Sequence, residues 1–137
     1  DLTIRTSYIG PCLYNKNEEL FDWFLQQTKE VDGYYNAYWN GVTTLELSKQ
    51  IQIIIKNNIS GLYHLCSNEK ISKYNLLMLI KKQWEKNNIK INKSSINKID
   101  RSLVDNRKEL NVPKYDKMFN ELFLFMNLNN NLYEHYS

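Results

Sequence analysis

Two arginines in the late segment "DRSLVDNRKEL" (100–110) are the residues best suited to bind a charged ligand. Each guanidinium presents a planar fork of N–H donors, and this fork matches the oxygens of a diphosphate. The two residues are Arg101 and Arg107. For both, the alternative is a solvated arginine on the protein surface.

A second candidate region is "YWNGVTTLELSKQI", in which a glycine precedes a helical pattern. Thr43 and Glu46 have the Thr-x-x-Glu spacing of a capping box, in which each side chain satisfies a free backbone N–H of the first helical turn. The bend at the glycine is either a plain connection between a strand and a helix or the rim of a binding cleft.

The sequence has no complete catalytic constellation. It contains no Gly-x-Gly-x-x-Gly, no phosphate-binding loop, no Ser-His-Asp set that can be placed and no Tyr followed four residues later by Lys. Cys12 and Cys66 lie far apart in no Cys-x-x-Cys pattern, His64 and His135 are isolated histidines, and none of the four has the spacing of zinc ligands. We therefore expect no catalytic residue and no metal ligand here, and the two cysteines are expected to be free thiols in a reducing cytoplasm.

The composition is that of a single modest α/β domain. The chain has 137 residues, of which 42% are hydrophobic and 24% are charged, and its net charge is +3. Its lysines are scattered, which argues against a nucleic-acid surface, and no apolar run approaches the roughly 20 residues that span a membrane. Because the chain opens at Asp1 directly in an apolar stretch, we expect a fragment.

Hydrophobic periodicity predicts strands that alternate with helices. Extended segments are expected at 2–10, 33–39 and 60–66, with a short strand within 89–99. Helices are expected at 17–30 with Asn17 as its cap, at 44–57, at 72–86 and at 115–127, followed by a polar tail. This alternation favours an α/β fold with largely parallel strand pairing.

Four segments, taken in order, resemble the extended short-chain dehydrogenases, and the first is most similar to the dTDP-4-dehydrorhamnose reductases among them. The segments are "LTIRTSYIGP", "GVTTLELSKQI", "SGLYHLCSNEKISKYNLLMLI" and "RSLVDNRKEL". The resemblance implies that residues 1–137 are the substrate-binding C-terminal half of such an enzyme. The fold would be the C-terminal part of a Rossmann-like parallel sheet plus a small, mostly helical substrate-binding region.

The resemblance also implies a function for the parent enzyme. That enzyme would reduce a dTDP-4-keto-6-deoxy sugar with hydride from NAD(P), while a Tyr in the missing N-terminal half would supply the proton. The fragment alone would be inactive and would not bind the cofactor tightly. A strand edge left bare by the missing half would favour a homodimer. A nucleotide-sugar epimerase or dehydratase and a non-catalytic α/β interaction module remain as alternatives.

Site residues follow from the same resemblance. Four residues would pass beside the nicotinamide: Thr6, Ser7, Ile9 and Gly10. Five would bind the substrate, with Arg101 and Arg107 on the diphosphate, Trp39 stacking, Asn40 hydrogen-bonding and Thr43 at the cleft rim. The alternatives are an ordinary buried strand for the first group and a helix cap for Thr43.

Overall fold

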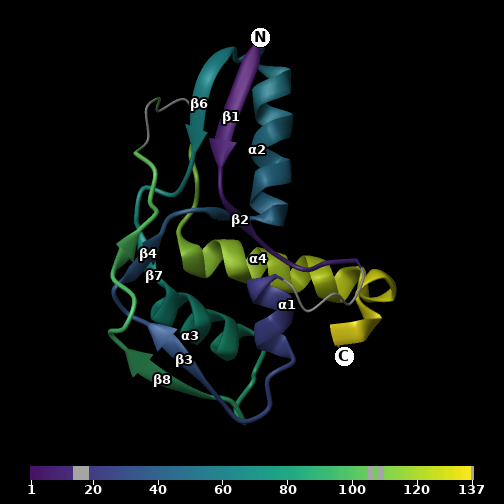
Figure 1. The fold of residues 1–137 in the computed structure, drawn as a ribbon. Coiled ribbons are helices and arrows are strands. Elements are labelled where there is room, and N and C mark those ends of the chain that lie inside the picture. Colours follow the sequence, from purple (N-terminus) through teal and green to yellow (C-terminus); the bar gives the residue numbers. More distant parts are fainter. Residues whose placement is uncertain (14–18, 105–106, 108–109, 137) are drawn as a thin grey trace.

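A computed structural model describes residues 1–13, 19–104, 107 and 110–136 of the chain. Strand β1 (Leu2–Thr6) lies parallel to β6 (Gly61–Leu65), with Leu2 opposite Gly61 and Thr6 opposite Leu65. Helix α2 (Thr44–Lys56) precedes β6 in the chain and runs along the β1–β6 pair in Figure 1. The parallel pairing and the mixed helices and strands confirm the predicted α/β class.

The predicted strand 2–10 is two strands that change partner at Ser7. Beyond that residue the chain continues as β2 (Tyr8–Ile9), which pairs in parallel with β5 (Val42–Thr43). Leu65 ends β6, and its carbonyl accepts the Thr6 hydroxyl at 2.8 Å. Ser7 follows Thr6 in the chain, and its carbonyl accepts the N–H of Val42 in β5 at 2.9 Å.

A second group of strands lies below the first in Figure 1. Strand β3 (Glu30–Tyr34) pairs in parallel with β8 (Lys90–Ser94), and α3 (Lys73–Gln83) packs on both. Strand β4 (Ala37–Trp39) runs between β7 (Ile71–Ser72) and β9 (Ile99–Asp100). The extended segment predicted at 33–39 is therefore confirmed as parts of two strands with a turn between them.

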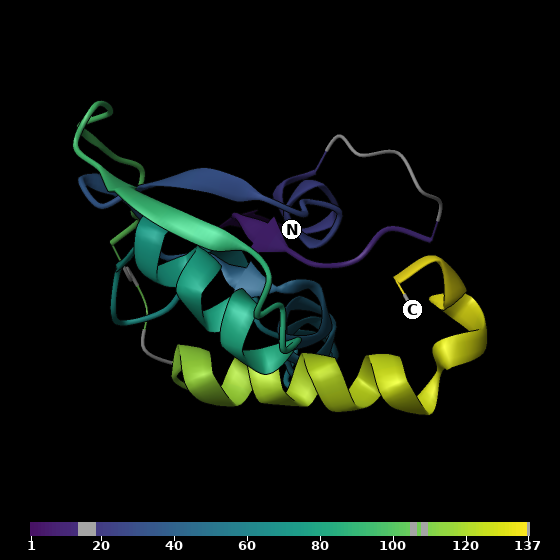
Figure 2. The same cartoon turned by 90° about the horizontal axis from the view of Figure 1, so that it is seen from below.

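Helix α4 (Tyr115–Leu128) joins the two groups, because it packs against α2, α3 and β5. Figure 2 shows it lying along α3, with the C-terminal segment folded back beyond its end. Large apolar side chains at the centre of this core are fully buried: Phe21, Phe24, Ile80, Phe119 and Leu122.

The predicted extent of the first helix, 17–30, is wrong. Helix α1 spans only Leu20–Leu25, because the chain must turn to place Val31 in β3 opposite Ile91. The predicted cap Asn17 lies outside the described residues. The polar tail instead forms two short 3-10 helices, Asn130–Leu132 and Glu134–Tyr136. The Tyr136 hydroxyl accepts the Cys12 N–H at 2.9 Å, so this end of the chain packs on the fold.

Candidate functional site

A broad cleft of about 830 Å³ opens where β1 and β4 end. Ligands collect at the carboxyl ends of strands in α/β sheets. Four cationic residues line this cleft, and none of the described lining residues is acidic. We call it the basic cleft and define it by these side chains: Arg5, Thr6, Ser7, Trp39, Lys73, Lys98 and Arg101. A cavity with this charge suits a polyanionic ligand.

Arg101 reaches the basic cleft from a loop that is held at three points. Its backbone N–H donates to the Tyr38 carbonyl at 3.0 Å. The preceding carboxylate, Asp100, accepts the Ser102 hydroxyl at 2.6 Å and the Ser102 N–H at 2.9 Å, and it pairs with Lys70 at 3.0 Å. Mainly the Ser102 bonds, helped by Lys70, lower the pKa of Asp100 to about 2. Arg101 itself forms no ion pair with a described carboxylate.

Trp39 stands on the border between the basic cleft and a second cavity. Its indole N–H donates to the Ser7 hydroxyl at 2.5 Å. The ring lies close to Gly41, where an added Cβ would meet the indole Cζ2 at 2.1 Å and the Ser7 carbonyl at 2.2 Å. On the other side the ring approaches Tyr115, at 6.0 Å between centroids. Gly41 is thus required for close approach of the indole.

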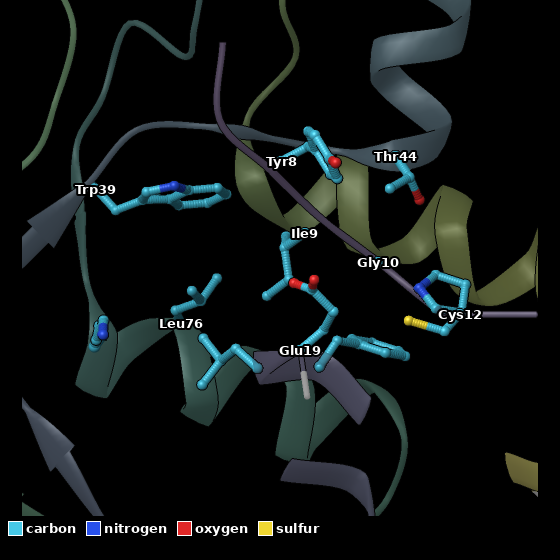
Figure 3. Close-up of a pocket in the computed structure, with 12 residues that line it drawn as sticks. Tyr8, Ile9, Gly10, Cys12, Glu19, Trp39, Thr44 and Leu76 are labelled. Atoms are coloured by element: carbon cyan, nitrogen blue, oxygen red, sulfur yellow. The ribbon is translucent and has the colours of Figure 1, made fainter. Parts of the chain in front are cut away.

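The second cavity is a pocket of about 330 Å³ that lies beyond Trp39. Figure 3 shows Ile9 and Leu76 on its inner wall, with Glu19 reaching toward Ile9. Its lining is mostly apolar, so we call it the apolar pocket and define it by these residues: Tyr8, Ile9, Gly10, Phe21, Trp39, Thr44, Lys73 and Leu76, with Glu19 at one side. Trp39 and Lys73 line both cavities.

The residues predicted to lie beside a cofactor divide between the two cavities. Thr6 and Ser7 line the basic cleft, whereas Ile9 and Gly10 line the apolar pocket. Together they form one continuous segment that passes from one cavity to the other. The Thr6 hydroxyl already donates to the Leu65 carbonyl.

Asn40 and Thr43 do not line either cavity among the described contacts, and both are buried. The Thr43 hydroxyl accepts the Glu46 N–H at 3.1 Å and so caps α2. In a full capping box the Glu46 carboxylate would accept the Thr43 N–H. Here the carboxylate instead accepts from the Gln50 amide at 2.5 Å. Thr43 therefore acts as a helix cap, which was the alternative to a place at the cleft rim. Asn40 forms its hydrogen bonds within the fold.

Arg107 lies at the other end of the β1–β6 pair. Its guanidinium donates to the carbonyl of Ser60, directly before β6, and it lies over the Tyr63 ring at 5.3 Å. The basic cleft instead borders the end of β1 at Thr6. The structure thus brings Arg101, Trp39, Thr6 and Ser7 together, but not Arg107.

Two lysines of the basic cleft, Lys73 and Lys98, have no counterpart among the predicted ligands. They come from α3 and from the loop before β9, so no spacing in the sequence connects them. Arg5, on β1, lines the same cleft.

Tyr115 is a buried tyrosine whose ring approaches Trp39. Burial raises its pKa, and its hydroxyl donates to the Gly41 carbonyl at 2.9 Å. This bond ties α4 to the loop that seats Trp39. Within the described ranges, no group of three potential metal ligands occurs and no helix is long and apolar enough to cross a membrane.

No protein-family model and no curated protein matches the chain. Solved structures do match it in fold. The dTDP-4-dehydrorhamnose reductase of Bacillus anthracis in complex with NADP is 14% identical with a TM-score of 0.71, covering 89% of this chain and 47% of that one. The corresponding protein of Clostridium acetobutylicum is 13% identical with a TM-score of 0.71, covering 90% and 48%.

A UDP-N-acetylglucosamine 4-epimerase from Bacillus cereus is 17% identical with a TM-score of 0.63, covering 90% of this chain and 45% of its own. The chain thus spans about half the length of the structures it matches. At these identities the likeness concerns the fold alone. The 137 residues have a fold found in dTDP-4-dehydrorhamnose reductases and in related nucleotide-sugar epimerases and dehydratases.

Proposed function

We propose that the chain is the substrate-binding part of an NAD(P)-dependent nucleotide-sugar reductase that acts on a dTDP-4-keto-6-deoxy sugar. The observation that carries this proposal is the basic cleft beside the apolar pocket, on the fold shared with those enzymes. The diphosphate would lie against Arg101, with the sugar reaching toward Trp39. Because Arg107 lies at the other end of the strand pair, we leave it out of the proposed site.

NAD(P) would meet the segment formed by Thr6, Ser7, Ile9 and Gly10. The faces of a nicotinamide ring are apolar, and the apolar pocket beside Ile9 offers a matching surface. The bound cofactor would supply the hydride. These residues would orient the ring and exclude water from it, while Trp39, held by Ser7, would separate the ring's pocket from the charged cleft.

The rest of the enzyme would come from sequence outside these 137 residues. The glycine-rich dinucleotide-binding turn and the Tyr proton donor are the parts it would supply. Among the described residues β1 pairs with β6 alone, so its other edge is open to further strands or to a second copy. Cys12 and Cys66 are not joined in a disulfide, which suits a cytoplasmic enzyme.

Calorimetric titration of the full-length protein with dTDP tests the binding part of this proposal. We expect Arg101→Met to weaken dTDP binding about tenfold, since it removes a charge-assisted contact to phosphate. Arg107→Met is the matched control, and it should leave the affinity unchanged. Failure of the wild-type protein to bind either dTDP or UDP would contradict the proposal and would favour an interaction module.

A turnover assay distinguishes a reductase from an epimerase. A reductase should oxidise NADPH only when a dTDP-4-keto-6-deoxy sugar is present. The alternative is an epimerase, since one solved structure with a similar fold is a UDP-N-acetylglucosamine 4-epimerase. In that case the protein would interconvert nucleotide sugars with no net oxidation of the cofactor, and the reductase assignment would be withdrawn.

A further inference from the structure

Lys73 lines three cavities in the described part of the chain. It borders the basic cleft, the apolar pocket and a third cavity, the groove, that is lined by Trp23 and Tyr34. Only Trp39 is also shared by the first two of these. Lys73 therefore stands at the junction where a ligand would pass from the charged cavity into the apolar one.

The Lys73 ammonium has no carboxylate partner in the described part of the chain. None of the ion pairs there involves it, although Glu19 lines the same pocket and Glu30 and Asp32 line the groove. The residue is exposed, while Ser72 before it is buried and caps α3 by accepting the Asn75 N–H at 3.1 Å. The start of this 11-residue helix adds partial positive charge at the same place.

A diphosphate carries two phosphoryl groups, and Arg101 can engage both oxygens of only one of them bidentately. Arg101 enters the basic cleft from the loop after β9, next to Lys98, away from the apolar pocket that it does not line. Lys73 enters at the border with that pocket. The two cations are thus placed along the direction in which a nucleotide sugar would extend.

We propose that Lys73 binds the phosphate that carries the sugar, leaving Arg101 for the phosphate next to the nucleoside. This assignment rests on the proposed function. It makes Lys73 the residue by which the site distinguishes a nucleoside diphosphate, or its sugar ester, from a nucleoside monophosphate.

The test compares dTDP with dTMP, titrated separately into the full-length protein and its variants. The wild-type protein should prefer dTDP, and Lys73→Met should reduce that preference about tenfold by weakening dTDP alone. Arg101→Met should weaken both nucleotides. Lys73→Arg should retain most of the preference, since it keeps the charge.

Lys82→Met is the matched control, because Lys82 is exposed on the same helix and lines none of the three cavities. It should leave both affinities unchanged. Lys73→Gln serves as a second neutral variant should Lys73→Met fold poorly. Equal weakening of dTDP and dTMP by the neutral variants, or no weakening, would overturn the assignment while leaving the proposed function intact. If the wild-type protein binds neither nucleotide, the proposed function fails, and this assignment fails with it.

Discussion

The side-chain amide of Asn40 pairs with the backbone of Leu103 at two points, across 63 residues of sequence. Its Oδ1 accepts the Leu103 N–H at 2.8 Å, and its Nδ2 donates to the Leu103 carbonyl at 2.6 Å. The same Nδ2 donates to the Ser67 carbonyl at 3.2 Å. Asn40 thus fixes the end of β4 to the loop that carries Arg101, and it shapes the basic cleft without lining it.

Asn40→Leu should destabilise the fold by about 2–3 kcal/mol. The substitution leaves the Leu103 N–H without its partner in a partly buried position, and it leaves the Leu103 carbonyl with only the weak Cys66 thiol donor at 3.7 Å. Loss of a partner at a buried polar group costs about 1–3 kcal/mol. Urea unfolding would measure the change. Faster hydrogen exchange at the Leu103 amide would show that the loop is the part released.

Asn88→Leu is the control for this substitution, because Asn88 is exposed in a turn. Its effect should stay within about 0.5 kcal/mol. If the two variants unfold at the same urea concentration, the Asn40–Leu103 pair does not contribute to stability.

Gly41→Ala should displace the Trp39 indole. An added methyl would lie 2.1 Å from the indole Cζ2 and 2.2 Å from the Ser7 carbonyl, so at least one of them must move. Overpacking of this kind costs about 1–3 kcal/mol. We expect lower thermal stability together with a shift in tryptophan fluorescence.

Gly61→Ala provides the contrast to this variant. Gly61 has φ of +91°, so alanine there costs about 1–2 kcal/mol in backbone strain alone. The stability loss should come with an unchanged fluorescence spectrum, since Gly61 lies at the start of β6. A fluorescence shift of equal size in both variants would mean that general loosening, rather than steric contact with Trp39, explains the Gly41 result.

Local signals in the sequence were sufficient to place the starts of α2 and α3. Thr43 and Ser72 each accept the N–H three residues later, a contact that depends only on neighbouring residues. The parallel partners β1 and β6 were also recognisable as strands, since β1 is rich in β-branched residues and β6 is a short apolar run that follows Ser60.

The features that local sequence patterns did not predict depend on contacts between residues far apart in the chain. The segment "EVDGY" of β3 has little strand propensity, and its pairing with β8 ends the helix that periodicity extended to residue 30. Asn40 was predicted from the family resemblance to bind the substrate, and its hydrogen bonds to Leu103, 63 residues away, could not be predicted from local sequence. The meeting of Arg5, Lys73 and Lys98 at one cleft likewise depends on three separate elements.

Glu46→Gln should stabilise the protein increasingly as pH rises. Burial raises the pKa of Glu46 above its ordinary value of 4.5, despite the Gln50 hydrogen bond. Between 4.5 and the raised native value, the native carboxyl holds a proton that the unfolded one has lost, so wild-type stability falls with rising pH. The glutamine variant lacks this loss. Unfolding measured across that range should show the gap between variant and wild type widening and then becoming constant.

Glu121→Gln is the comparison, because Glu121 pairs with Lys49 near the same helix but is partly exposed. Exposed pairs contribute about 0–1 kcal/mol, so its effect on stability should be small. A gap between Glu46→Gln and wild type that narrows as pH rises would contradict the burial of an ionisable carboxyl at that position.

Ser102→Ala should raise the pKa of Asp100 from about 2 toward 3.8, and by more than Lys70→Met does. The hydroxyl bond at 2.6 Å is short and directed, whereas both partners of the Lys70 pair are about half exposed and screened by solvent. Because folding lowers this pKa, the carboxylate's contribution is present above 3.8 and is lost as pH falls through about 2. Carboxyl NMR titration of both variants measures which substitution raises the pKa of Asp100 more. A larger shift in Lys70→Met would mean that ion pairing, rather than the turn made with Ser102, holds the loop that presents Arg101.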